Sequence, residues 1–243
     1  MRYISAERIG GGMKYLWTED RGAGLHFWQL ANRYMFNGEL LVESKGSNQG
    51  ILDAVRILEP AETDLYYLAF DIVYDNMDVV NKLLELQELA AKHPRQIIIL
   101  DMTCFEYIIF SFSRLIEWTG SGHKDVVDMR NHILQAVRNH KIDIGAISDE
   151  KTRRYLMGFK RFSTEKVIKS MTYMLTDGDE WNVKGEKMGD CWYKDCCVLS
   201  PKHKKQCGLD VASGYEKLTK LFEDVEFQRI MSVQKSSFSP EYI

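Results

Sequence analysis

The fold of this chain is decided by the stretch Leu65-Tyr66-Tyr67-Leu68-Ala69-Phe70-Asp71, in which a short apolar and aromatic run ends in an acid. Such a run is typical of a buried β-strand. After Tyr74-Asp75-Asn76 a long helix is expected to about Lys92, where His93-Pro94 closes it, because proline cannot continue a helix. The segment therefore predicts a strand, a loop and a helix.

The same unit occurs on both sides of this stretch. Upstream, Glu39-Leu40-Leu41-Val42 predicts a strand that ends at Glu43, and a helix is expected from about residue 48 to 58, before Pro60. Downstream, Gln96-Ile97-Ile98-Ile99-Leu100 predicts a third strand, which ends at Asp101. Strands that alternate with helices at this spacing predict an α/β fold with a parallel sheet and flanking helices.

The rest of the chain gives the expected organisation. Residues 1–37 predict a loop followed by a short helix near 25–35, and residues 38–120 predict the α/β core, with a helix from 103 to 118 before Gly120-Ser121-Gly122. Residues 121–243 predict a mainly helical C-terminal region, with helices near 124–140, 149–158, 163–176 and 213–231 and a turn-rich, cysteine-bearing segment between the last two.

Composition restricts the class of protein. The chain has 243 residues and a formal net charge of −3, so contact with nucleic acid has to come from a local basic patch. It contains no long apolar run and no apolar signal-peptide core near its start, which predicts no membrane contact. Five cysteines, an odd number, favour a reducing compartment, so a cytoplasmic location is expected.

Acids follow each of the expected strands. Glu43, Asp71 and Asp101 stand at the strand ends, and Asp75 lies four residues beyond Asp71. Ligands of an open parallel sheet bind beyond the carboxyl ends of its strands, so these carboxylates are expected to converge there. Hard oxygen ligands suit Mg²⁺ or Mn²⁺. The alternative is that each acid is an ordinary loop residue or a helix cap.

The segments Glu43-Ser44-Lys45-Gly46-Ser47-Asn48 and Phe70-Asp71-Ile72-Val73-Tyr74-Asp75-Asn76 together resemble the Toprim family, the metal-binding fold of topoisomerases, primases and several nucleases. The resemblance covers about residues 38–112. It implies that Glu43 is a metal ligand or a general acid or base, and that Asp71 and Asp75 are metal ligands. Asp75 is displaced from the family spacing, and Ser44 replaces the usual glycine. Such looser variants resemble overcoming-lysogenization-type nucleases and anti-phage Toprim effectors, in which a further glutamate joins the site, here Glu106.

The resemblance implies a Mg²⁺-dependent nuclease, a hydrolase of the phosphodiester bonds of DNA or RNA, with catalytic residues Glu43, Asp71, Asp75 and Glu106 and a role in antiviral defence. Two alternatives remain open. One is a catalytically inactive Toprim-like module that binds or regulates a partner in a defence or replication complex, and the other is a primase-type nucleotidyl transferase. A protein partner that controls activity is compatible with each of them.

Two segments carry candidate substrate-binding residues. Lys45 and Ser47 lie in the loop after Glu43, where a cation and backbone N–H groups can hold a phosphate. Farther along, Lys151 to Phe162 interleaves cations with aromatic residues, a composition that can bind nucleic acid, and its candidates are Arg153, Arg154, Lys160 and Arg161. The alternative for this basic stretch is a solvated helix face.

The cysteine-bearing segment contains a second candidate metal site. Cys191, Cys196, His203 and Cys207 are soft ligands that can close a tetrahedral zinc site, although no Cys-x-x-Cys pair is present. Free buried cysteines are the alternative.

Overall fold

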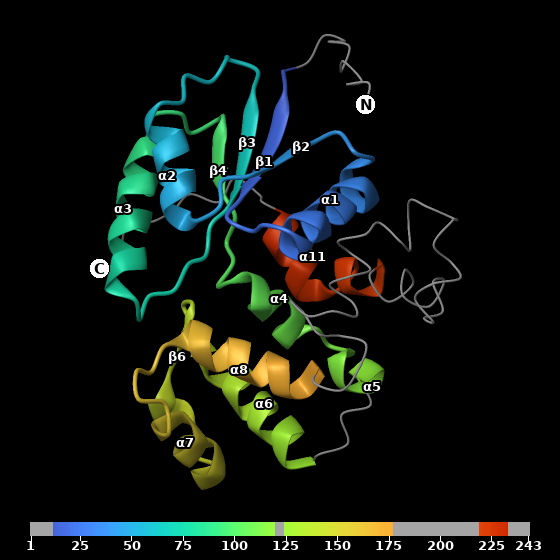
Figure 1. Cartoon of the computed structure of the whole chain (residues 1–243), viewed down its shortest axis with the longest axis vertical. Coiled ribbons are helices and arrows are strands. Elements are labelled where there is room, and N and C mark those ends of the chain that lie inside the picture. Colours follow the sequence, from blue (N-terminus) through green and yellow to red (C-terminus); the bar gives the residue numbers. More distant parts are fainter. Residues whose placement is uncertain (1–11, 120–123, 177–218, 233–243) are drawn as a thin grey trace.

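The structure is a computed structural model that describes residues 12–119, 124–176 and 219–232 (Figure 1). The first part of the chain forms β1 (Lys14–Thr18), α1 (Ala23–Phe36), β2 (Leu41–Ser44), α2 (Asn48–Arg56), β3 (Leu65–Ala69), α3 (Met77–Ala91) and β4 (Ile97–Ile99). The second part forms α4 (Phe105–Ser111), α5 (Leu115–Thr119), α6 (Lys124–Ala136), β5 (Val137–Arg138), β6 (Lys141–Ile142), the 3-10 helix η1 (Ile144–Ala146), α7 (Glu150–Met157), α8 (Thr164–Thr176) and α11 (Val225–Met231).

The main sheet of the described residues has four strands in the order β2-β1-β3-β4, and every neighbouring pair is parallel. The fold is therefore α/β, with a parallel sheet, flanking helices and a mainly helical C-terminal region, as the sequence predicts. This topology is consistent with a Toprim-like fold. Parallel strands end at the same edge, so the loops after β1, β2, β3 and β4 lie together at the carboxyl edge of the sheet.

The prediction that residues before about 25 form only a loop is wrong. Residues 14–18 form β1, a central strand hydrogen-bonded to β2 on one side and β3 on the other. Leu16 and Trp17 are buried on opposite faces, and the ring of Tyr15 stacks on that of Tyr66 in β3 at a centroid distance of 4.5 Å. These contacts with distant segments stabilise a strand whose own sequence is only half apolar.

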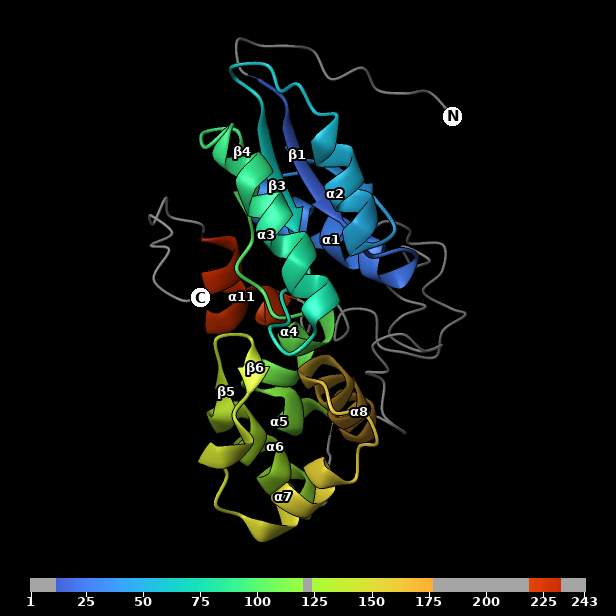
Figure 2. The same cartoon turned by 90° about the vertical axis from the view of Figure 1, so that its left-hand side faces the viewer.

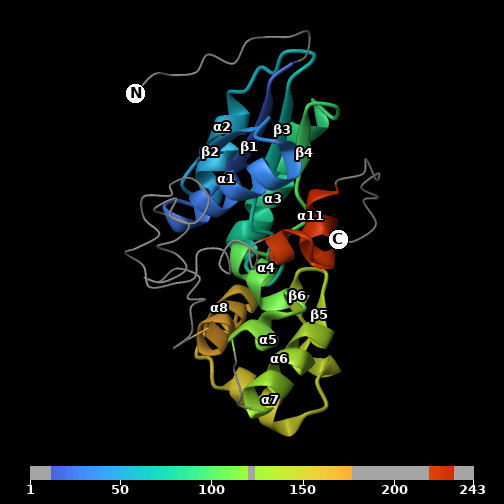
Figure 3. The same ribbon diagram turned by 90° about the vertical axis from the view of Figure 1, so that its right-hand side faces the viewer.

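Two apolar layers cover the sheet. On one face α2 and α3 bury Ile51, Leu52, Leu83 and Leu86 against Leu68 and its neighbours (Figure 2). On the other face α1 contributes Phe27 and Trp28, and α4 and α11 pack next to it, with Phe227 of α11 in edge contact with Phe27 (Figure 3). The second layer continues into α6 and α8, so the sheet and the helical region share one core.

The helical region differs from the sequence prediction in two places. The expected helix 103–118 is divided into α4 and α5, because Ser113 between them donates its N–H and hydroxyl to Asp224, the residue that caps α11. The expected helix 124–140 ends at Ala136, and β5 and β6 follow as a hairpin. Asn139 and His140 form its turn with φ of 47° and 57°, the left-handed conformation that tight hairpins require. Over the described residues, the structure contains no helix of the length and apolar character needed to span a bilayer.

Candidate functional site

A pair of acids lies at the carboxyl edge of the two central strands. Glu19 follows β1 directly, and Asp71 lies two residues after β3, while Thr18 and Ala69 are register partners. The sequence analysis included Asp71 but missed Glu19, because β1 was not recognised. The available signal was the short apolar and aromatic run Tyr15-Leu16-Trp17, followed after Thr18 by Glu19-Asp20.

Asp71 is a buried acid in an unfavourable environment. Its side chain is 7% exposed, and Oδ1 is shielded from solvent and accepts no hydrogen bond from the described residues. Burial, followed by the negative charges of Glu19, Asp20 and Glu106, raises the pKa of Asp71 well above its ordinary value. A buried charge without a partner is costly, so this environment disfavours the ionised form of the Asp71 carboxyl group.

Glu19 is the direct neighbour of Asp71. Burial is the largest cause that raises the pKa of Glu19, while a hydrogen bond with Asp71 and another from the backbone N–H of Asn48 oppose it. The Asn48 N–H lies 3.0 Å from Glu19 Oε2. The hydrogen bond between the two acids thus lowers the pKa of Glu19 and raises that of Asp71, so their titrations are linked.

Asn48 fixes the relative position of the two loops. This residue begins α2, whose N-cap is Ser47, and its side-chain amide donates to the carbonyl of Asp71 at 3.0 Å and accepts from the Asp71 N–H at 3.1 Å. Its own backbone N–H binds Glu19. One residue thus holds both members of the acid pair in place.

Asp20, next to Glu19, has a structural role. Its Oδ2 accepts hydrogen bonds from the Thr18 hydroxyl and from Nε1 of the buried Trp28, both at 2.9 Å. These contacts tie the β1–α1 loop to α1. Its charge still contributes to the raised pKa values of Glu19 and Asp71.

Glu106 lies close to the acid pair, as the sequence analysis expects. It is in the first turn of α4, its side chain is 6% exposed, and its charge raises the pKa of Asp71. Lys169 of α8 places its Nζ 3.7 Å from Glu106 Oε1. In addition, the charge of Glu165, one turn before Lys169, acts on Glu19. The first turns of α8 therefore border the cluster.

Glu43 does not join Asp71 as expected. It lies on the edge strand β2, and β1 separates that strand from β3. Its carboxylate is 46% exposed and pairs with Lys45 at 2.8 Å. Lys45 Nζ also lies 4.0 Å from the ring centroid of Trp17, and the Ser47 hydroxyl accepts the Gly50 N–H as the cap of α2. Both expected phosphate-binding side chains thus already have partners within the protein.

Asp75 and Asp101 also have partners away from the acid pair. Asp75 Oδ2 accepts the N–H and the hydroxyl of Thr164, at 2.7 and 2.8 Å, and so fixes the start of α8, while its Oδ1 is buried without a hydrogen bond from the described residues. Asp101 accepts from His140 Nε2 at 2.7 Å and pairs with Arg229 of α11. The hydrogen bond from His140 is the main cause that lowers the pKa of Asp101 to about 2.

The remaining candidates lie elsewhere. Arg153 and Arg154 are exposed on α7, where Arg154 pairs with Glu150, and Lys160 and Arg161 are exposed in the α7–α8 loop. Cys191, Cys196, His203 and Cys207 lie outside the described residues, so the zinc site stays a prediction.

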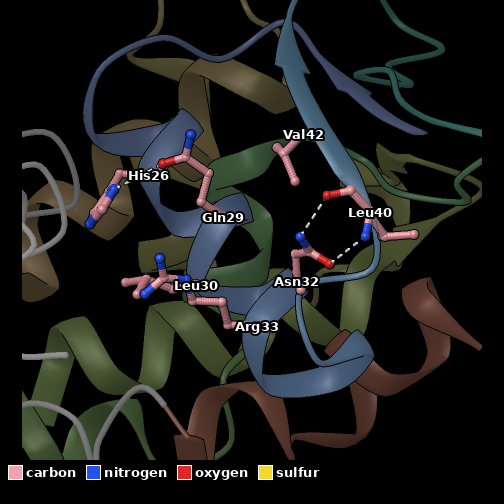
Figure 4. A pocket seen from close by; sticks show the side chains of 8 residues that line it. His26, Gln29, Leu30, Asn32, Arg33, Leu40 and Val42 are labelled. Carbon is pink, nitrogen blue, oxygen red and sulfur yellow. Dashed lines mark hydrogen bonds between the residues drawn. The ribbon is translucent and has the colours of Figure 1, made fainter. Parts of the chain in front are cut away.

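A pocket of about 310 Å³ lies between α1 and β2 (Figure 4). His26, Gln29 and Arg33 of α1 line it, and Asn32 forms two hydrogen bonds with the backbone of Leu40 at its wall. None of the acids described above lines this pocket, so it is separate from the acid pair.

The donor set of the acid pair limits the metals that it fits. Within the described ranges, no three His, Cys, Asp or Glu side chains are placed to hold a metal ion together. Mg²⁺, however, keeps several waters and is usually bound by one or two carboxylates together with substrate phosphates. Glu19 and Asp71, with the free Oδ1 of Asp71, fit that requirement.

Comparison of the chain with protein-family models, with curated proteins and with solved structures found no match.

Proposed function

We propose that this chain is a Mg²⁺-dependent phosphodiesterase that cleaves nucleic acid and that Glu19 and Asp71 hold the metal. The observation that carries the proposal is the buried Oδ1 of Asp71, which has no hydrogen-bond partner among the described residues and lies in a cluster with Glu19 and Glu106. An acid kept there for stability alone would have a donor or a cation beside it.

The chemistry of the cluster supports hydrolysis. Mg²⁺ held there would neutralise phosphate charge and lower the pKa of a bound water. The chain's own residues then have distinct tasks. Asp71 and Glu19 would hold the cation, Glu19 oriented by the Asn48 N–H, and Glu106, whose charge acts on Asp71, would be the candidate acid or base.

The resemblance to the Toprim family supports the choice of substrate. A glutamate follows the first strand in that family, and Glu19 now meets this condition, because β1 is the first strand and lies next to β3. Nucleic acid as substrate and a role in antiviral defence rest on this resemblance. A cytoplasmic location is part of the proposal and rests on the odd number of cysteines.

One contact favours a second candidate, a Toprim-like module without catalysis that binds or regulates a partner. Lys169 Nζ approaches Glu106 Oε1 and brings a positive charge to the cluster. A resident ammonium group of this kind can partly replace the charge of a metal ion. In such a module the acid pair would be a remnant of a metal site.

A metal titration separates the two candidates. We expect the full chain to bind Mn²⁺, measured by calorimetry, and to cleave at least one of plasmid, single-stranded DNA, tRNA and total RNA. Glu19→Gln and Asp71→Asn should each weaken Mn²⁺ binding at least about tenfold, because a two-carboxylate site loses half of its protein ligands.

Glu43→Gln is the matched control, since Glu43 lies at the same edge of the sheet but pairs with Lys45. It should bind Mn²⁺ like the wild type. If the wild type binds no Mn²⁺, only the proposal of a non-catalytic module stands. If Glu43→Gln loses Mn²⁺ binding, the metal site lies at β2 and not at Glu19 and Asp71.

A further inference from the structure

Arg21 lies beside the proposed metal site, two residues after Glu19 in the β1–α1 loop. Its guanidinium rests directly on the backbone of Gly46, in the loop after β2. A Cβ at Gly46 would lie 2.2 Å from Nη2 and 2.7 Å from Nε of Arg21. Gly46 also has a φ of +79°. Both this backbone conformation and the close approach of Arg21 therefore require a glycine at this position.

The guanidinium of Arg21 forms no ion pair within the described part of the protein. No carboxylate there lies within ion-pair distance of Arg21, although Glu19 and Asp20 are its near neighbours in sequence. By contrast, Lys45 in the same pair of loops is bound to Glu43 and packs on Trp17. Arg21 is therefore a cation at this edge that has no ion-pair partner among the described residues and is available to a ligand.

The backbone brings this guanidinium close to the acid pair. Gly46 precedes Asn48 by two residues, and the Asn48 N–H lies 3.0 Å from Glu19 Oε2. Standard backbone dimensions then place the guanidinium within roughly 13 Å of the Glu19 carboxylate. A nucleic-acid strand with one phosphate bound at Glu19 and Asp71 would bring that phosphate, or the next one, within reach of Arg21.

We infer that Arg21, seated on Gly46, binds a phosphate group of the nucleic-acid substrate beside the Glu19–Asp71 pair. The inference rests on the proposed function. The planar guanidinium presents two parallel N–H groups to phosphate oxygens, a geometry that lysine does not reproduce. Arg21 thus takes the role that the sequence analysis gave to Lys45 and Ser47.

Binding of a fluorescein-labelled single-stranded DNA to the full chain tests this inference. Anisotropy is measured over a range of salt concentrations, both in EDTA and with Ca²⁺. Arg21→Ala should weaken binding roughly 10- to 100-fold and reduce the salt slope by about one unit, because one charge-assisted phosphate contact is lost. Arg21→Lys should recover part of the affinity. Arg33→Ala, which removes another exposed arginine, in the last turn of α1 and away from the β1–α1 loop, is the control and should bind like the wild type.

Gly46→Ala tests the contact between Arg21 and the backbone of residue 46 without removing the charge of Arg21. It should weaken DNA binding in the wild-type background and have little further effect once Arg21 is alanine. Equal DNA binding by Arg21→Ala and wild type would overturn the inference. If, in addition, Arg21→Ala bound inorganic phosphate more weakly than the wild type does, Arg21 would be assigned to a small phosphate ligand instead.

The Mn²⁺ titration keeps the two claims apart. If the wild type binds no Mn²⁺ but Arg21→Ala still loses DNA affinity, the metal site fails and the phosphate contact stands. If Mn²⁺ binds through Glu19 and Asp71 while Arg21→Ala has no effect, the opposite holds.

Discussion

Asp71→Asn should stabilise the metal-free protein while it abolishes cleavage. The substitution removes the negative charge from a buried group whose Oδ1 accepts no hydrogen bond from the described residues, so little favourable contact is lost. The backbone of Asp71 keeps both of its hydrogen bonds to the Asn48 side chain. The new amide can donate to the Glu19 carboxylate at all pH values, whereas the aspartate can do so only while it is protonated.

The size of the stabilisation follows from the hydrogen bond that the new amide donates to the Glu19 carboxylate. A hydrogen bond to a charged group contributes about 1.5–3 kcal/mol, and we expect a gain in the free energy of unfolding of this order at neutral pH. For a chain of this length it corresponds to an increase of roughly 3–10 °C in the melting temperature. Asp128→Asn, at an exposed position on α6, is the matched control and should change stability by less than about 0.5 kcal/mol.

The gain should depend on pH in a defined direction. The pKa of Asp71 in the folded protein is raised above its ordinary value of 3.8, so the folded state binds this proton more tightly than the unfolded state does. Wild-type stability from this group is present below pH 3.8 and is lost as the pH rises through the folded pKa. The advantage of Asp71→Asn should therefore be small in acid and reach its full size above the folded pKa.

Urea unfolding with and without Mg²⁺ provides the assay. Mg²⁺ should raise the unfolding midpoint of the wild type, because a ligand that binds the folded state stabilises it, and should leave Asp71→Asn unchanged. A destabilised Asp71→Asn protein at neutral pH, or equal stabilisation of both proteins by Mg²⁺, would refute the argument that Asp71 is a strained metal ligand.

Three further predictions follow from contacts described above. Asp75→Asn should lower the free energy of unfolding by about 1–2 kcal/mol and keep Mn²⁺ binding within twofold, with Thr164→Val as the partner in a double-mutant cycle; loss of Mn²⁺ binding would instead make Asp75 a ligand. Asp101→Asn should lower the free energy of unfolding by less than about 1 kcal/mol, because the carboxylate is half exposed. This stabilisation is present above pH 3.8 and is lost toward pH 2, and acid unfolding of the wild type and Asp101→Asn measures it. Gly46→Ala should cost about 1 kcal/mol or more in thermal unfolding, and a neutral result would mean that its positive φ is not required.

The sequence predicted the elements whose signals are local. The strands β2, β3 and β4 are short apolar runs, and α2 and α3 begin with side-chain caps at Ser47 and Asn76 and have an apolar face. Each of these signals depends on residues within one or two turns of the chain. The α/β class therefore could be inferred before any tertiary contact was known.

The features that were missed depend on distant contacts. β1 is a strand because β2 and β3 bind it on both sides, and its five residues alone do not distinguish a strand from a loop. Glu19 meets Asp71 across 52 positions of sequence, and Asp75 meets Thr164 across 89. Without β1, Glu43 was the only glutamate available at the end of an expected strand. The position of β1 in the sheet is what separates Glu43 from Glu19.

The Asn48 side chain extends the hydrogen-bond pattern of the sheet beyond the end of β3. Its Oδ1 accepts the N–H of Asp71 and its Nδ2 donates to the carbonyl of Asp71, as the backbone of a neighbouring strand would. The loop that carries Asp71 is thereby preorganised, and a ligand that binds there loses little affinity to the ordering of this loop. The amide proton of Asp71 should then exchange with solvent as slowly as those of β3, even though Asp71 lies outside any strand.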